Sequence, residues 1–146
     1  MKIQRKRRDF LKIIVCIDER FGMLFFGKRL SRDRVLLEDM KKHIGEGRLY
    51  CHPYSEKLLD SAEIKYKSRE DFLDKAKGGD FCFVENIHIR AYMDEVSELV
   101  IYNWNRHYPS DMQLDIIPGT FGLKLVEKRD FVGSSHERIT KEIYRK

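Results

Sequence analysis

Residues 11–44, LKIIVCIDERFGMLFFGKRLSRDRVLLEDMKKHI, contain the signals that decide the fold. The run 11–17 is short and apolar and is followed directly by charged residues, which is typical of a buried strand. After a loop, Ser31 fits the N-cap of an amphipathic helix over residues 31–43, and the glycines at 45–47 end that helix. The stretch therefore predicts a strand, a loop and a helix in succession.

Asp33 lies in the first turn of the predicted helix, on the face that carries Leu37, Met40 and Ile44. A first-turn carboxylate can simply complement the helix dipole, which is the plainer interpretation of this spacing. It can also be a functional group in a partly apolar cleft, where it would bind a cationic or amide-like ring and where desolvation would shift its pKa. The spacing leaves both interpretations open.

The rest of the chain alternates strands and helices up to residue 104. Further strands are predicted at 48–51, 80–86, 98–104 and 123–128, and further helices at 53–62, 68–79 and 89–96. Strands dominate after residue 104, so the order predicts a single three-layered α/β domain over residues 11–146. Its sheet is expected to be mostly parallel with an antiparallel C-terminal end, and 11–17 should pair in parallel with 80–84 or 98–104.

The C-terminal segment 134–146 fits two structures. Ser134 and Glu137 have the spacing of a capping box, and Ile139 and Ile143 lie four residues apart, which favours a helix. The same segment also alternates like an edge strand. The residue pattern alone does not decide between them.

Composition limits the class of protein. The 146 residues are 42% hydrophobic and 36% charged, which is typical of one globular domain. No apolar run approaches the roughly 18 residues that a membrane helix needs. The cysteines Cys16, Cys51 and Cys82 are isolated and odd in number, so we expect reduced thiols in a cytoplasmic protein.

The positive charge is concentrated in residues 1–10, MKIQRKRRDF, which hold five cations and one carboxylate and so carry +4 of the net +5. A basic N-terminal arm of this kind can bind nucleic-acid phosphates. No basic stripe continues into the remaining chain, so a nucleic-acid partner is the less favoured interpretation.

Several stretches together resemble the dihydrofolate reductase family. IIVCIDERFG, followed by LSRD opening a helix, is similar to the family's N-terminal strand, flexible loop and acid-bearing turn. Residues 79–104 are similar to its strand–helix–strand unit, Asp111 matches a loop position, and residues 121–146 are similar to its closing strand pair. The resemblance covers 11–146 and favours a strand for the ambiguous terminus. According to this resemblance, Asp33 occupies the position of the pterin-binding acid, and Leu37 occupies a position at which an apolar residue covers the pterin.

The chain departs from the family where the cofactor phosphates bind. A Gly-Arg pair of the family is replaced by His52-Pro53, and its Gly-Gly turn is replaced by VEN at residues 84–86. A glutamate at a phosphate-facing helix N-terminus repels the anion that the helix dipole would attract. The resemblance therefore implies a retained fold with a dismantled NADPH site, and it assigns no cofactor-binding residues and no metal.

The resemblance also implies a substrate site. The catalytic acid Asp33 should face a cleft lined by Ile17, Leu37, Met40 and Tyr102, which would accept a small flat heterocyclic ligand with paired N–H donors. We expect a small-molecule-binding protein that has lost NADPH. The alternative is an NADPH-dependent reductase of a pterin-like heterocycle with Asp33 as proton-relay acid, and a further alternative is a nucleic-acid-associated protein acting through the basic arm.

The sequence disfavours two hydrolytic functions. The chain looks like short bacterial proteins labelled ribonuclease Z, but it lacks the His-x-His-x-Asp-His cluster that such two-metal hydrolysis needs. SSH at 134–136 places a serine next to a histidine, but adjacent residues rarely form a nucleophile–base pair, so this stretch is expected to be a turn.

Overall fold

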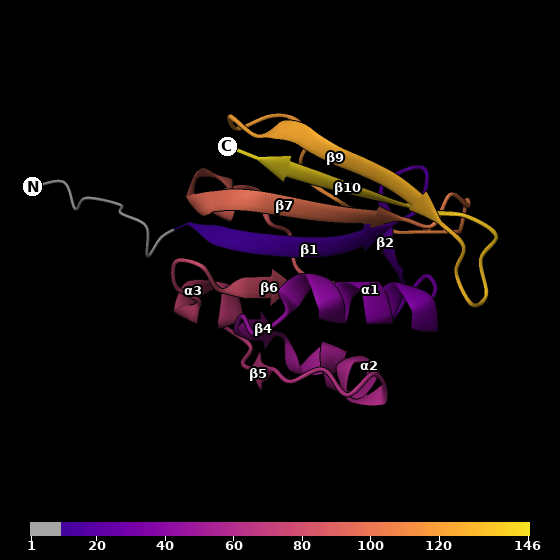
Figure 1. Ribbon diagram of the computed structural model, residues 1–146, viewed down its shortest axis with the longest axis horizontal. Coiled ribbons are helices and arrows are strands. Elements are labelled where there is room, and N and C mark those ends of the chain that lie inside the picture. Colours follow the sequence, from indigo (N-terminus) through magenta and orange to yellow (C-terminus); the bar gives the residue numbers. More distant parts are fainter. Residues whose placement is uncertain (1–9) are drawn as a thin grey trace, which may run out of the picture.

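The computed structural model describes residues 10–146, whose main sheet has the strand order β5-β4-β6-β1-β7-β10-β9 (Figure 1). The strands are β1 (Leu11–Ile17), β4 (Leu49–Cys51), β5 (Lys67–Ser68), β6 (Phe81–Phe83), β7 (Val96–Asn103), β9 (Lys124–Phe131) and β10 (Ile139–Arg145). β1 pairs in parallel with both β6 and β7, and β10 runs antiparallel to β7 and β9. The predicted mixed α/β sheet is confirmed. The predicted basic arm falls almost wholly on residues 1–9, which lie outside the described residues.

β1 is central because both of its faces are apolar. Ile13, Val15 and Ile17 enter one buried cluster, whereas Ile14 enters the other and Cys16 packs against that second cluster. Alternate residues of a strand face opposite sides of its sheet. This alternation decides which β1 side chains can reach a ligand on either face.

Helices cover the two faces. α1 (Arg34–Ile44) and α2 (Glu56–Ser61) contribute to the cluster that contains Ile14, and the short 3-10 turn η2 (Pro53–Ser55) leads into α2. α3 (Phe72–Lys75) and η3 (Arg90–Glu95) contribute to the cluster on the other face. A small second sheet, in the order β3-β2-β8, is formed by Lys28–Arg29, Gly22–Phe25 and Met112–Gln113. No helix within residues 10–146 has the length and apolarity to cross a membrane.

Several predicted boundaries differ from the structure. α1 begins at Arg34 rather than at residue 31, and its N-cap is Asp33, not Ser31. The helix predicted at 68–79 is reduced to the single turn of α3, because Ser68 belongs to β5 and pairs with Cys51. The helix predicted at 89–96 is 3-10 in geometry. The C-terminal segment forms a strand, as the family resemblance predicted, so its helical alternative is wrong.

Candidate functional site

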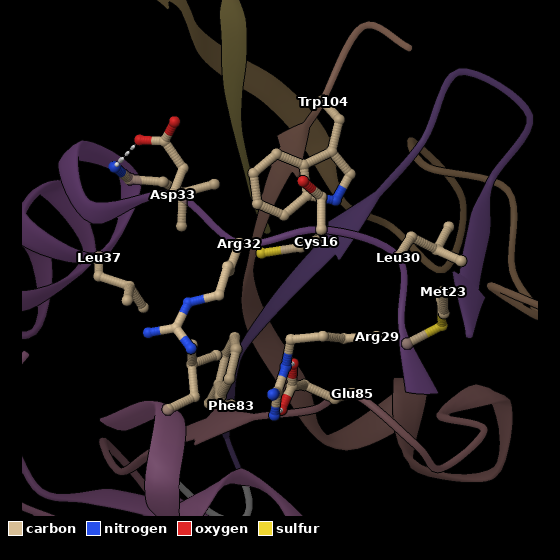
Figure 2. Close-up of a pocket in the computed structure, with 13 residues that line it drawn as sticks. Cys16, Met23, Arg29, Leu30, Arg32, Asp33, Leu37, Phe83, Glu85 and Trp104 are labelled. Carbon is tan, nitrogen blue, oxygen red and sulfur yellow. Dashed lines mark hydrogen bonds and ion pairs between the residues drawn. The ribbon is translucent and has the colours of Figure 1, made fainter. Parts of the chain in front are cut away.

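A cleft that is partly open to solvent lies at the carboxyl ends of β1 and β6 beside the start of α1 (Figure 2). Its apolar wall is formed by Met23, Leu30, Leu36, Leu37, Leu58, Phe83 and Trp104, and its polar lining by Cys16, Arg29, Ser31, Arg32, Asp33 and Glu85. Ligands of open α/β sheets bind beyond the carboxyl ends of the strands, and their pockets are mostly apolar with a few polar groups. The cavity has both properties.

The residues that the sequence predicted for the site divide into two groups. Asp33 and Leu37 line the cavity. Met40 and Tyr102 are fully buried in the core between α1 and the sheet, and Ile17 belongs to the cluster on the opposite face, so these three are not among the lining residues. Cys16, the neighbour of Ile17, is the β1 residue that lines the cavity.

The Asp33 carboxylate is turned away from the centre of the cavity, as Figure 2 shows. Its Oδ1 accepts two backbone N–H groups of the first turn of α1, at 2.9 and 3.1 Å, and the backbone N–H of Ser134 at 3.0 Å. Its Oδ2 accepts the backbone N–H of Ser135 at 2.9 Å and lies 2.9 Å from Nδ1 of His136. The side chain has no exposed surface. Direct recognition of a flat ring by this carboxylate is therefore not the role that the geometry favours.

These contacts control the charge of Asp33. Burial alone would raise its pKa, but the hydrogen bond from His136 and those from the backbone of Ser135, Ser134 and Leu36 hold that pKa far below the usual range. Asp33 is thus an ionised, acceptor-only group. It caps α1 and holds the loop between β9 and β10 against the start of this helix.

His136 connects that loop to the cavity. Its side chain is only 3% exposed, and its ring stacks on the Trp104 indole with 4.6 Å between ring centroids and 27° between planes. Nδ1 faces Asp33, and Nε2 lies 2.9 Å from Oγ of Ser31 and 3.3 Å from the Tyr108 hydroxyl. Sequence reasoning missed this arrangement, because Ser31 and His136 are 105 residues apart and no local pattern joins them.

A second polar cluster lies at the other side of the cavity. Arg29 and Glu85 form a two-point ion pair, and Oγ of Ser55 donates to Oε1 of Glu85 at 2.7 Å. Tyr54 adds to the cluster, because its hydroxyl accepts the backbone N–H of Arg29 at 2.8 Å. Burial, with a smaller contribution from Glu85, raises the pKa of the Cys16 thiol, so this thiol stays protonated and is a poor nucleophile.

Within residues 10–146, no group of three or more His, Cys, Asp or Glu side chains is arranged to hold a metal ion.

The fold is similar to that of dihydrofolate reductase from Enterococcus faecalis, whose structure contains NADP(H) and RAB-propyl. The two share 12% identity with a TM-score of 0.65, over 94% of this chain and 96% of that one. This likeness shows the fold and confirms the architecture that the sequence resemblance predicted. No family model and no curated protein matches the chain, and the resemblance to proteins labelled ribonuclease Z gains no support.

Proposed function

We propose that the protein binds a small flat heterocyclic molecule in the cavity beside α1 and does so without NADPH. The observation that carries this proposal is the cavity's composition. The aromatic rings of Phe83 and Trp104 and the side chain of Leu37 provide an apolar lining suited to a planar ring. Arg32 also lines the cavity and offers N–H donors, so a ligand with acceptor atoms fits it best.

The groups near the end of β6 do not fit a dinucleotide. Glu85 presents a carboxylate there, and the guanidinium that could attract a phosphate, that of Arg29, is already held by this carboxylate. Asn86 adds a buried side-chain oxygen that has no partner among the described residues, but an oxygen acceptor cannot bind a phosphate oxygen. Nδ1 of His52 accepts the backbone N–H of Tyr54. These residues support a protein that has lost the cofactor.

Trp104 provides the test, because it is the single tryptophan of the chain and lines the cavity. Its fluorescence should change on titration with pterins, pyrimidines or purines, and the same compounds should raise the melting temperature. Leu30→Phe narrows the cavity and should weaken the affinity measured by fluorescence at least about tenfold. Leu125→Phe, at a leucine of β9 that is 48% exposed, is the matched control and should respond like the wild type.

NADPH separates this proposal from the reductase alternative. We expect no binding up to millimolar NADPH, whereas micromolar binding would favour a reductase of a pterin-like heterocycle. Binding in this cavity would be contradicted if no heterocycle changed the fluorescence or the melting temperature. It would also be contradicted if Leu30→Phe and Leu125→Phe bound the heterocycles equally well. A nucleic-acid role of the basic arm would instead appear as salt-dependent binding to RNA or DNA.

A further inference from the structure

We propose that Ser31, His136 and Asp33 form a nucleophile–base–carboxylate triad at the edge of the cavity, and that the protein hydrolyses small carboxylic esters bound there. This inference rests on the proposed binding of a small molecule in the same cavity, and it names the reaction and the substrate class. The three side chains come from distant parts of the chain. Ser31 and Asp33 lie between β3 and α1, and His136 lies between β9 and β10.

The distances match the arrangement that activates a serine. Oγ of Ser31 lies 2.9 Å from Nε2 of His136, and Nδ1 of His136 lies 2.9 Å from Oδ2 of Asp33. A nucleophile and a base within hydrogen-bond distance, with the base oriented by a third group, are the general signature of an activated nucleophile. The residue order along the chain is irrelevant, because such triads are recognised by geometry.

The proton positions follow from Asp33. Its ionised carboxylate can only accept, so Nδ1 of His136 carries a proton and donates it. Nε2 of the neutral ring is then an acceptor, and the hydroxyl of Ser31 donates to it. Tyr108 is the weaker partner of Nε2, since its hydroxyl lies at 3.3 Å. Stacking on Trp104 fixes the plane of the ring.

The surroundings distinguish this serine from a surface residue. Ser31 is partly exposed and lines the cavity, whereas His136 and Asp33 are buried behind it. The neighbouring Ser135 does not take its place, because its Oγ lies 3.2 Å from Nδ1 of His136, on the side that faces Asp33. The adjacent SSH residues therefore form no nucleophile–base pair, as expected, and the partner of the base is the remote Ser31.

Donors for the developing oxyanion also line the cavity. Among the residues described, the indole N–H of Trp104 has no hydrogen-bond partner. The guanidinium of Arg32 holds only a 3.3 Å bond to Ser61. N–H groups that point at the developing charge stabilise the tetrahedral intermediate of acyl transfer, and these two side chains are the donors that the cavity offers. The apolar walls favour an ester with a short acyl or a small aromatic group.

The reaction is a balanced hydrolysis. Oγ of Ser31 attacks the carbonyl carbon while its proton passes to Nε2 of His136, and the carbon–oxygen bond to the alcohol breaks as the alcohol takes up that proton. Water then attacks the acyl group on Ser31 and gives its proton to His136. The bond between the acyl group and Oγ breaks, and Oγ recovers the proton. One ester and one water become one carboxylic acid and one alcohol.

The test uses the full chain with p-nitrophenyl butyrate and with a fluorophosphonate that labels activated serines. We expect a single adduct by intact mass, mapped to Ser31, and release of p-nitrophenol with an initial burst. Ser31→Ala should abolish the adduct, and His136→Phe, which keeps a ring against Trp104, should slow labelling at least about 100-fold. Ser97→Ala, at a partly buried serine of β7, is the control and should label like the wild type.

Asp33 acts through His136 and is a positioning residue, so its test is a pH profile. In the wild type, labelling requires Nε2 of His136 to accept the serine proton, so its rate should depend on pH. In Asp33→Asn the neutral ring can adopt the other tautomer, so labelling should stay slow at every pH tested. Thermal unfolding checks that this variant is folded. A variant that merely loosens the fold would keep the wild-type profile at a lower amplitude.

Two outcomes would overturn the triad. One is a folded wild type that binds heterocycles through Trp104 but gives no adduct, which leaves cavity binding intact. The other is labelling that persists in Ser31→Ala. An adduct on Ser31 that Leu30→Phe blocks and Leu125→Phe does not would support the triad and the cavity together. An adduct insensitive to Leu30→Phe would place the reaction outside the cavity and overturn the inference as stated.

Discussion

Arg29 and Glu85 face each other with Nε–Oε2 at 2.8 Å and Nη2–Oε1 at 2.9 Å, and this pair joins β3 to the residues that follow β6. The arrangement is the bidentate geometry in which guanidinium and carboxylate match best. The two side chains are only 23% and 8% exposed, so solvent screens the pair weakly. The pair therefore fixes one wall of the cavity.

Glu85→Gln should destabilise the protein by about 2–4 kcal/mol, because it leaves the half-buried Arg29 charge without a counter-ion. The measurement is urea unfolding of the variant and the wild type. The control is Asp71→Asn, which removes the same kind of partner from Arg69 in a pair that is 53% and 45% exposed. This control should change stability little, and equal effects of both variants would contradict the structural role of the Arg29–Glu85 pair.

Asp33→Asn should lower the free energy of unfolding by about 2–4 kcal/mol at neutral pH, through the loss of charge-assisted hydrogen bonds. Because folding depresses the pKa of Asp33, its stabilisation is present above the ordinary value of 3.8 and disappears as the pH falls toward the folded value. The gap between wild type and variant should therefore narrow below about pH 4 in acid-unfolding curves. Asp94→Asn, at an exposed carboxylate of η3, should show no such gap.

Glu98 makes a second contribution to folding stability that is lost in acid. Burial would raise its pKa, but hydrogen bonds from His43 and Arg145, at 2.9 and 2.8 Å, lower that pKa to about 2. The stabilisation is complete above the ordinary value of 4.5 and is lost as the pH falls toward 2. Glu98→Gln should lower the melting temperature at pH 6 and have less effect at pH 3. Glu46→Gln, at an exposed loop residue, should change neither melting temperature.

Gly133→Ala should loosen the loop between β9 and β10. A Cβ at this position would overlap Oδ2 of Asp33 and lie 2.8 Å from Cδ1 of Ile139. Gly27→Ala is the control, since a Cβ there meets open space and only a φ of +73° opposes it, at roughly 1 kcal/mol. Gly133→Ala should lower the melting temperature more than this control and slow labelling of Ser31. The reverse order would contradict close packing of the loop on Asp33.

The sheet was predictable because its signals are local. Leu11–Ile17 is apolar at nearly every position, so a buried strand was the natural prediction, and it pairs in parallel with β6 and β7. The spacing of Ile139 and Ile143 was ambiguous for a physical reason. Residues four apart share a face in a helix and also in a strand, and both isoleucines are buried in β10.

The site was less predictable because its contacts are remote. Ser134 does act as a helix cap, but not for its own segment. Its hydroxyl accepts the backbone N–H of Arg34, 100 residues earlier, and so helps to cap α1. Ser31 fits the sequence pattern of an N-cap for α1, but its hydroxyl faces His136 instead. Alternation along β1 places Cys16 and Ile17 on opposite faces of the sheet, but it does not show which of the two faces α1 covers.

The loop between β9 and β10 also sets the order in which the chain can fold. The backbone of Ser134 and Ser135 binds Asp33 across 101 and 102 residues, so these bonds form only after almost the whole chain has been brought together. Contacts between residues so far apart in the sequence tend to form after local ones, because the chain between them must first be brought together. Docking of the C-terminal hairpin thus completes the cap of α1 and delivers His136 to Ser31 in one late step. A newly made chain would gain its final rigidity and its proposed reactivity at the same moment.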